Sequence, residues 1–242
     1  MRLTVVNASN LIQPADFHVV LAAVARQVKE DFTPEWNIPA SVRGATAKIG
    51  KKQAPIEGNH DAIIYVGDSS QDPTTGVSGA YGYHFTNHRD IPYGFVYLDI
   101  CEKNGDEWSS TLSHEVLELL ADPSVILTVT GPHPKRKRGY AHFDLEICDP
   151  TQGDTYQVDS VHVSNFVTRK YFGMTGGSDS TNFMKLPLKP FGVRPGGYFQ
   201  YEDAHGAHEI DGKKAAARIK IRRAARAMML GHRRNTRRAD RL

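Results

Sequence analysis

The stretch that most constrains this fold is residues 108–123, which the sequence predicts to be a single helix. Ser109 or Ser110 is suited to cap its N-terminus. Asp122-Pro123 ends it, because proline disfavours the α conformation in the residue before it. Its apolar residues recur at helical spacing, which predicts one face packed on a core: Leu112, Val116, Leu119 and Leu120.

The same helix carries three side chains suited to metal binding or acid–base chemistry, His114, Glu115 and Glu118. Residues four apart share a helix face, so His114 and Glu118 can reach one point in space. This is the arrangement of His-Glu-x-x-His zinc helices, with a glutamate in the second ligand position. The alternative is an amphipathic helix whose polar face simply carries these residues, so the choice depends on the rest of the chain.

Before this helix, the sequence predicts the element order β-α-β-β-β-β-α. The early helix begins at Pro14 and closes at 31–36. The run 79–85 contains glycines that are typical of a bulge or of close approach by another segment, so we expect an edge strand beside a cleft. The expected strands are 2–7, 45–49, 61–67, 79–85 and 93–100.

After the helix the pattern becomes β-rich, with strands expected at 125–130, 140–149, 156–158, 161–167 and 196–201. Apolar and polar residues alternate along 140–149, which places Glu146 on the polar face. Zinc needs about four ligands, and catalytic sites keep one position for water. Glu146 is therefore a candidate third protein ligand, and Asp149, before Pro150, competes with it. The alternative for Glu146 is a solvated carboxylate on a β face.

Two linked motifs carry a family resemblance. The first is Ser-His-Glu-x-x-Glu-x-x-x-Asp-Pro over 113–123, and the second is Glu-x-x-Asp-Pro over 146–150. Together they resemble a family of uncharacterised bacterial and phage proteins that is itself similar to zincin-like metallopeptidases. The similarity spans roughly residues 15–202, and its further landmarks are 79–85, 163–167 and 196–198.

The resemblance implies an α+β, zincin-like fold: a mixed sheet with an N-terminal helix and an active-site helix, then a β-rich C-terminal half. It also implies a zinc cofactor and a peptide or protein substrate. The expected zincin-like domain covers 1–212, with subdomains 1–123 and 124–212. Good helix formers and basic residues after it predict a basic helical tail over 213–242.

In such a hydrolase the metal lowers the pKa of its bound water from 15.7 toward about 7. Glu115 then takes the proton as general base and returns it to the leaving amine. His84 and Tyr83 are candidates for substrate contact and oxyanion stabilisation, with His142 and Tyr140 as further candidates.

Charge is unevenly distributed along the chain. Residues 213–242 hold 12 of the 30 Lys and Arg residues and one of the 27 acidic residues, so the tail carries about +11 and the body about −8. Such a tail binds phosphates or an acidic protein partner, or remains solvated and flexible. It lacks the aromatic residues that single-strand readout uses. The candidate contacts are Arg222, Arg223, Arg226, Arg233, Arg234, Arg237 and Arg238.

The sequence has no secretory signal and no apolar run near the ~20 residues of a membrane helix. Cys101 and Cys148 are too few for a disulfide framework and are expected as small buried side chains. We therefore expect a cytoplasmic or virion-associated protein. The rival to a hydrolase is a non-catalytic virion or nucleoprotein component that keeps the fold and is anchored by its tail.

Overall fold

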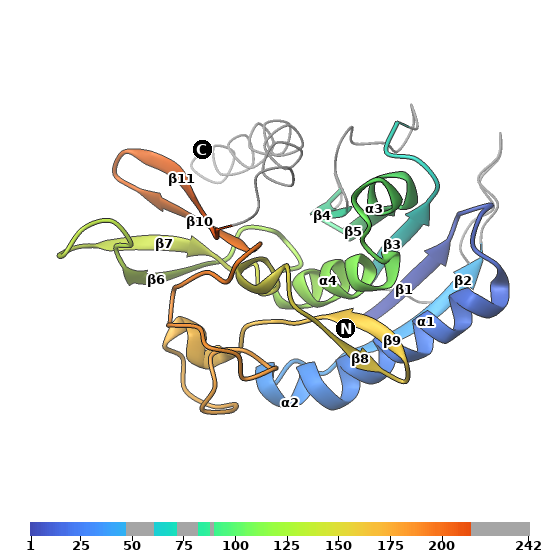
Figure 1. Ribbon diagram of the computed structural model, residues 1–242, viewed down its shortest axis with the longest axis horizontal. Coiled ribbons are helices and arrows are strands. Elements are labelled where there is room, and N and C mark those ends of the chain that lie inside the picture. The colour runs from blue at the N-terminus through green and yellow to red at the C-terminus, as the bar shows by residue number, and fades with distance from the viewer. Residues whose placement is uncertain (47–60, 72–81, 88–89, 214–242) are drawn as a thin grey trace.

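The computed structural model describes residues 1–46, 61–71, 82–87 and 90–213 (Figure 1). Helices pack on a five-stranded mixed sheet, and smaller sheets follow in the C-terminal half. The expected α+β class and mixed sheet are confirmed. Beyond Lys213 the expected basic tail lies outside the described residues. Within these ranges no helix combines the length and apolar composition that crossing a membrane requires.

The larger sheet has the strand order β2-β1-β3-β5-β4. The first four strands in this order run parallel, and β4 pairs antiparallel with β5 at the edge. The strands are β1 Arg2–Asn7, β2 Ser41–Thr46, β3 Ala62–Gly67, β4 Gly82–Thr86 and β5 Pro92–Tyr97. The sheet therefore ends in the edge strand that the glycine pattern predicted.

Two strand predictions in this half are wrong in their bounds. β2 begins at Ser41 rather than at 45, and residues 47–49 of that prediction lie outside the described residues. The strand expected at 93–100 is cut short by helix α3, Leu98–Asn104, because the buried side chain of Ile100 joins the core from a helix instead.

The early helix is longer than a single α segment. Helix α1, Pro14–Gln27, continues through a π-helical turn at Val28–Phe32 into α2, Thr33–Trp36. Apolar residues at helical spacing along this segment predict one buried stripe. Leu21 is partly buried against the core, and the other four members lie in it: Phe17, Val20, Val24 and Val28.

Helix α4, Trp108–Ala121, is the predicted metal-binding helix, and it ends where Asp122-Pro123 was expected to stop it. The predicted serine cap is wrong: Glu107 is the N-cap residue, and Ser109 Oγ donates instead to the carbonyl of His162. Eleven of the 14 residues of α4 are buried. The helix thus has no solvated polar face, because edge strand β4 and residues 148–149 cover the side that carries the ionisable residues.

That C-terminal half contains a four-stranded antiparallel sheet of order β11-β10-β7-β6 and a separate β8-β9 hairpin that packs on α4 and α1 (Figure 1). Its elements are β6 Thr128–Pro132, β7 Tyr140–Asp144, a short helix at Asp149–Thr151, β8 Thr155–Val158, β9 Val161–Ser164, a short helix at Arg169–Phe172, β10 Tyr198–Asp203 and β11 Gly206–Asp211.

The strand predicted at 140–149 is wrong beyond Asp144. Leu145 N still donates to the carbonyl of Leu127, but the chain then turns into the short helix that begins at Asp149. Glu146 therefore lies in a connecting loop and not on the face of a strand. The hairpin prediction is confirmed, although β9 ends at Ser164, before the expected 167, and the strand expected at 125–130 begins at Thr128.

A buried hydrogen-bond chain ties the two halves of the molecule together. Ser113 Oγ on α4 donates to Gln27 Oε1 on α1 and accepts from the backbone N–H of Ser164 on β9, at 2.7 and 2.9 Å. Gln27 Nε2 donates to the Ser164 carbonyl at 2.9 Å. One hydrophobic core cluster includes buried residues from both halves of the part of the chain that the structure describes.

Candidate metal centre

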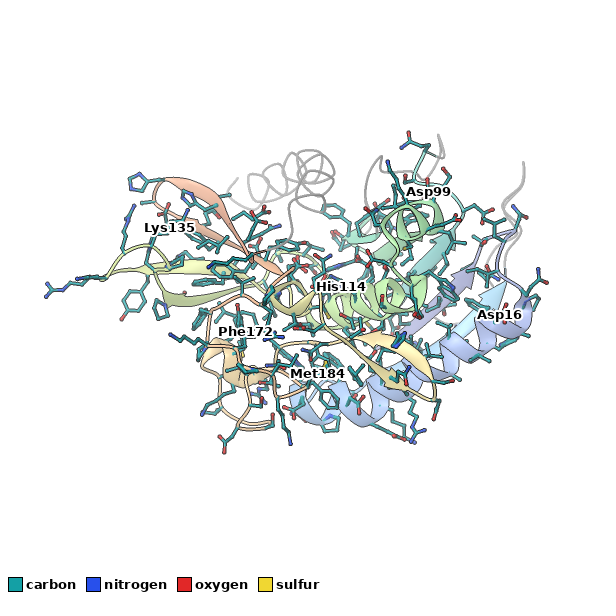
Figure 2. All side chains as sticks on the ribbon, viewed as in Figure 1. Asp16, Asp99, His114, Lys135, Phe172 and Met184 are labelled. Atoms are coloured by element: carbon teal, nitrogen blue, oxygen red, sulfur yellow. The ribbon has the colours of Figure 1, made fainter. Side chains whose placement is uncertain are left out.

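His114 lies near the middle of the molecule, where α4 runs between the large sheet and the C-terminal half (Figure 2). His114 Nε2 lies 3.0 Å from Glu118 Oε2, as the four-residue spacing predicted. Both residues are less than 9% exposed. The amphipathic alternative required this face to be solvated, and its burial argues against that alternative.

The loop after β7 brings a third donor to this pair. Asp149 Oδ1 lies 3.3 Å from His114 Nε2, and it accepts no hydrogen bond from the residues that the structure describes. The backbone N–H groups of Cys148 and Asp149 donate to Glu118 Oε1 at 3.0 and 3.2 Å. These two bonds orient the Glu118 carboxylate so that its other oxygen faces His114.

Cys148 is a donor that the sequence reasoning treated only as a small buried side chain. Its burial is confirmed, but its sulfur also lies in a group with donor atoms of His114 and Glu118 that are all within 4.8 Å of one another. Burial raises the pKa of this thiol well above its ordinary value, and the nearby Glu118 raises it further. The adjacency of Cys148 to Asp149 was the only sequence signal for its position.

His84 enters the cluster from the edge strand β4. Its Nδ1 lies 3.4 Å from Glu115 Oε2, and its Nε2 lies 3.8 Å from Glu146 Oε2. Donor atoms of His84, Glu115 and Glu118 lie within 4.8 Å of one another. The structure thus groups Glu146 with His84, and it places Asp149 beside His114.

The remaining candidates for substrate contact lie elsewhere. Tyr83 is next to His84 on β4 and so faces the opposite side of the sheet, where it stacks on Phe95 with ring centroids 5.5 Å apart. Tyr140 is 76% exposed, and the exposed His142 bonds to Thr130 on the neighbouring strand. None of these three belongs to the cluster.

The buried imidazoles and carboxyl groups of the cluster shift one another's pKa values. Burial lowers the pKa of His114, but Glu118 and Asp149 outweigh this effect and hold it well above its usual 6.5. Burial likewise lowers the pKa of His84, yet Glu115 and Glu146 raise it to about 9. Burial raises the pKa of Glu118, and His114 only partly offsets this.

Both shifts favour the protonated imidazole, and four carboxyl groups surround the two rings, those of Glu115, Glu118, Glu146 and Asp149. Buried charge of this kind is costly unless a cation compensates it. The nitrogen and oxygen donors, with a thiol adjacent, match the ligand chemistry of zinc. The residues that are present therefore fit a divalent transition-metal ion.

A separate surface pocket of about 490 Å³ opens near the N-terminal end of α4, where Trp108, Cys101 and Leu98 form part of its lining. It shares no residue with the cluster. The seven candidate arginines of the tail lie outside the described residues.

No protein-family model, curated protein or solved structure matches this chain. Function is therefore inferred from the geometry of the cluster.

Proposed function

We propose that this protein is a zinc-dependent hydrolase with a zincin-like fold, and that its substrate is a peptide. The observation that carries the proposal is the convergence of His114, Glu118 and Asp149 in a buried site at the junction of α4 and the loop after β7. These three residues would hold the metal. Cys148 lies close enough to supply a further donor.

A zinc ion at this place would polarise a substrate carbonyl and lower the pKa of a bound water molecule. Glu115 is the residue of this chain that would take and return the proton, because it follows His114 in sequence and lies on the His84 side of the same cluster. The contact between His84 Nδ1 and Glu115 Oε2 would position that carboxylate.

The edge strand β4 supports a peptide as the substrate. Its free edge pairs with no other strand among the residues that the structure describes. An extended peptide can add to such an edge through backbone hydrogen bonds. A peptide there would run beside His84 and Glu115, with its carbonyl groups close to the cluster.

Substitution of the general base tests the proposal. We expect Glu115→Gln to lower peptide hydrolysis by about 10²–10⁴-fold, the usual contribution of acid–base catalysis, while bound metal is retained. Hydrolysis is measured on a mixed peptide library by mass spectrometry, and metal content by elemental analysis. Glu102→Gln, on the exposed side of α3, is the matched control. Equal hydrolysis by Glu115→Gln and wild type, or protein that binds no zinc, would contradict the proposal.

A second candidate function follows from the charge distribution. The last 30 residues carry 12 of the 30 basic side chains, which supports binding of nucleic acid or of an acidic partner subunit. In a virion-associated protein without catalysis, this tail would be the functional element. Deletion of the tail from the whole chain tests this candidate.

A further inference from the structure

We propose a second divalent-cation site next to the first, held by His84 and Glu146 and sharing Glu118 with it. This inference rests on the proposed function, because Glu118 is also a ligand of the first metal. The two sites would form one centre in which α4 supplies the common carboxylate. Edge strand β4 and the loop after β7 would supply the remaining ligands of the second site.

The two ring nitrogens of His84 carry the argument. Nδ1 faces Glu115 Oε2 at 3.4 Å, so the carboxylate accepts a hydrogen bond from it. Nε2 is buried in a residue that is 5% exposed, and none of the described residues gives it a hydrogen-bond partner. A histidine that gives one N–H to a carboxylate and presents its other nitrogen to the site is the usual arrangement of a metal ligand.

The distance to Glu146 is consistent with a shared cation. His84 Nε2 and Glu146 Oε2 are 3.8 Å apart, too far for a hydrogen bond. Two donors that are each about 2.1 Å from one zinc ion lie roughly 3.4 Å apart at a tetrahedral angle. A shift of a few tenths of an ångström would therefore allow both atoms to bind one ion.

Glu118 connects the two sites. Its carboxylate belongs to the group with His114 and Cys148 and also to the group with His84 and Glu115. Its Oε1 accepts two backbone N–H groups, so the carboxylate is fixed in place between the two imidazoles. Each imidazole thus has its own carboxylate, Asp149 for His114 and Glu146 for His84, with Glu118 common to both.

The number of buried donors is also enough for two ions. Glu115, Glu118, Glu146 and Asp149 bring four carboxyl groups into a site whose side chains are at most 12% exposed. Grouped carboxyl groups in a protein interior are costly unless cations bind between them.

The test is the metal content of the full-length protein. Protein stripped by a chelator is reloaded with excess Zn²⁺, desalted and measured by elemental analysis. We expect two zinc ions per chain in wild type and one in both His84→Gln and Glu146→Gln. His18→Gln, which changes an exposed histidine on α1, should keep two. Far-UV circular dichroism checks that each variant is folded.

A second measurement does not depend on any variant. Wild type loaded with Mn²⁺ should give the exchange-coupled electron paramagnetic resonance spectrum of two neighbouring ions, and an isolated-ion spectrum would overturn the second site. If wild type binds one zinc ion per chain and His84→Gln still binds one, the second site is overturned and the proposed function stands. If wild type binds one zinc ion and both His84→Gln and His114→Gln lose it, the two histidines share a single ion, and the second site is again overturned. Protein without zinc would overturn both proposals.

Discussion

At position 82, a glycine sets how closely the edge strand approaches α4. A Cβ atom there would lie 2.7 Å from Glu115 Oε1 and 2.9 Å from the backbone oxygen of Phe95, and the backbone oxygen cannot move aside as a flexible side chain can. We therefore expect Gly82→Ala to lower the free energy of unfolding by about 1–3 kcal/mol, the usual cost of overpacking. The measurement is urea denaturation. Gly67→Ala is the matched control, because no atom of the described residues lies within 4 Å of the added Cβ. We expect the stability of this variant to equal that of wild type. Equal stability of the two variants would show that β4 and α4 are not packed this closely.

At the scale of elements, Ser113 joins α1, α4 and β9 through its hydroxyl group. Ser113→Ala would leave Gln27 Oε1 and the Ser164 N–H without this partner in the interior. An unsatisfied buried polar group costs about 1–3 kcal/mol, so we expect an unfolding free energy lower by at least that amount. Thermal and urea denaturation measure it. Ser110→Ala is the control on the same helix, since its hydroxyl bonds only to the adjacent Glu107 carbonyl near the surface, and we expect a change within about 0.5 kcal/mol. If Ser113→Ala is as stable as Ser110→Ala, the Ser113 hydroxyl does not stabilise the packing of α1, α4 and β9.

At the scale of the whole molecule, an acidic body of about −8 is joined to a tail of about +11. If the tail binds nucleic acid, the full chain should retain duplex DNA, and this retention should weaken steeply with added salt because phosphate binding releases counterions. Deletion of 214–242 should abolish the retention. The deletion begins after Lys213, whose carbonyl accepts the N–H of Gly196 and belongs to the folded body. The full chain with its seven candidate arginines changed to glutamine is the matched control and should also fail to bind. DNA retention that survives the deletion would remove nucleic acid as the partner of the tail.

Some of this structure follows from local rules that the sequence already contains. The spacing of His114 and Glu118 puts their donor atoms 3.0 Å apart, because helical geometry fixes residues four apart. Asp122-Pro123 ends the helix, and the apolar pattern of α1 predicts which of its residues are buried. The glycine-containing run before β5 predicts the edge strand. In each case the cause lies within one element or at its ends.

The tertiary structure decided which distant groups complete the site. Alternation along 140–149 favoured Glu146 as the third ligand beside His114, but the strand ends at Asp144. The backbone N–H groups of Cys148 and Asp149 then turn toward Glu118, so Asp149 is the carboxylate that reaches His114. The burial of the ionisable face of α4 likewise comes from elements far along the chain. A sequence pattern encodes the contacts that a helix or strand makes with itself, whereas long-range packing depends on where every element ends.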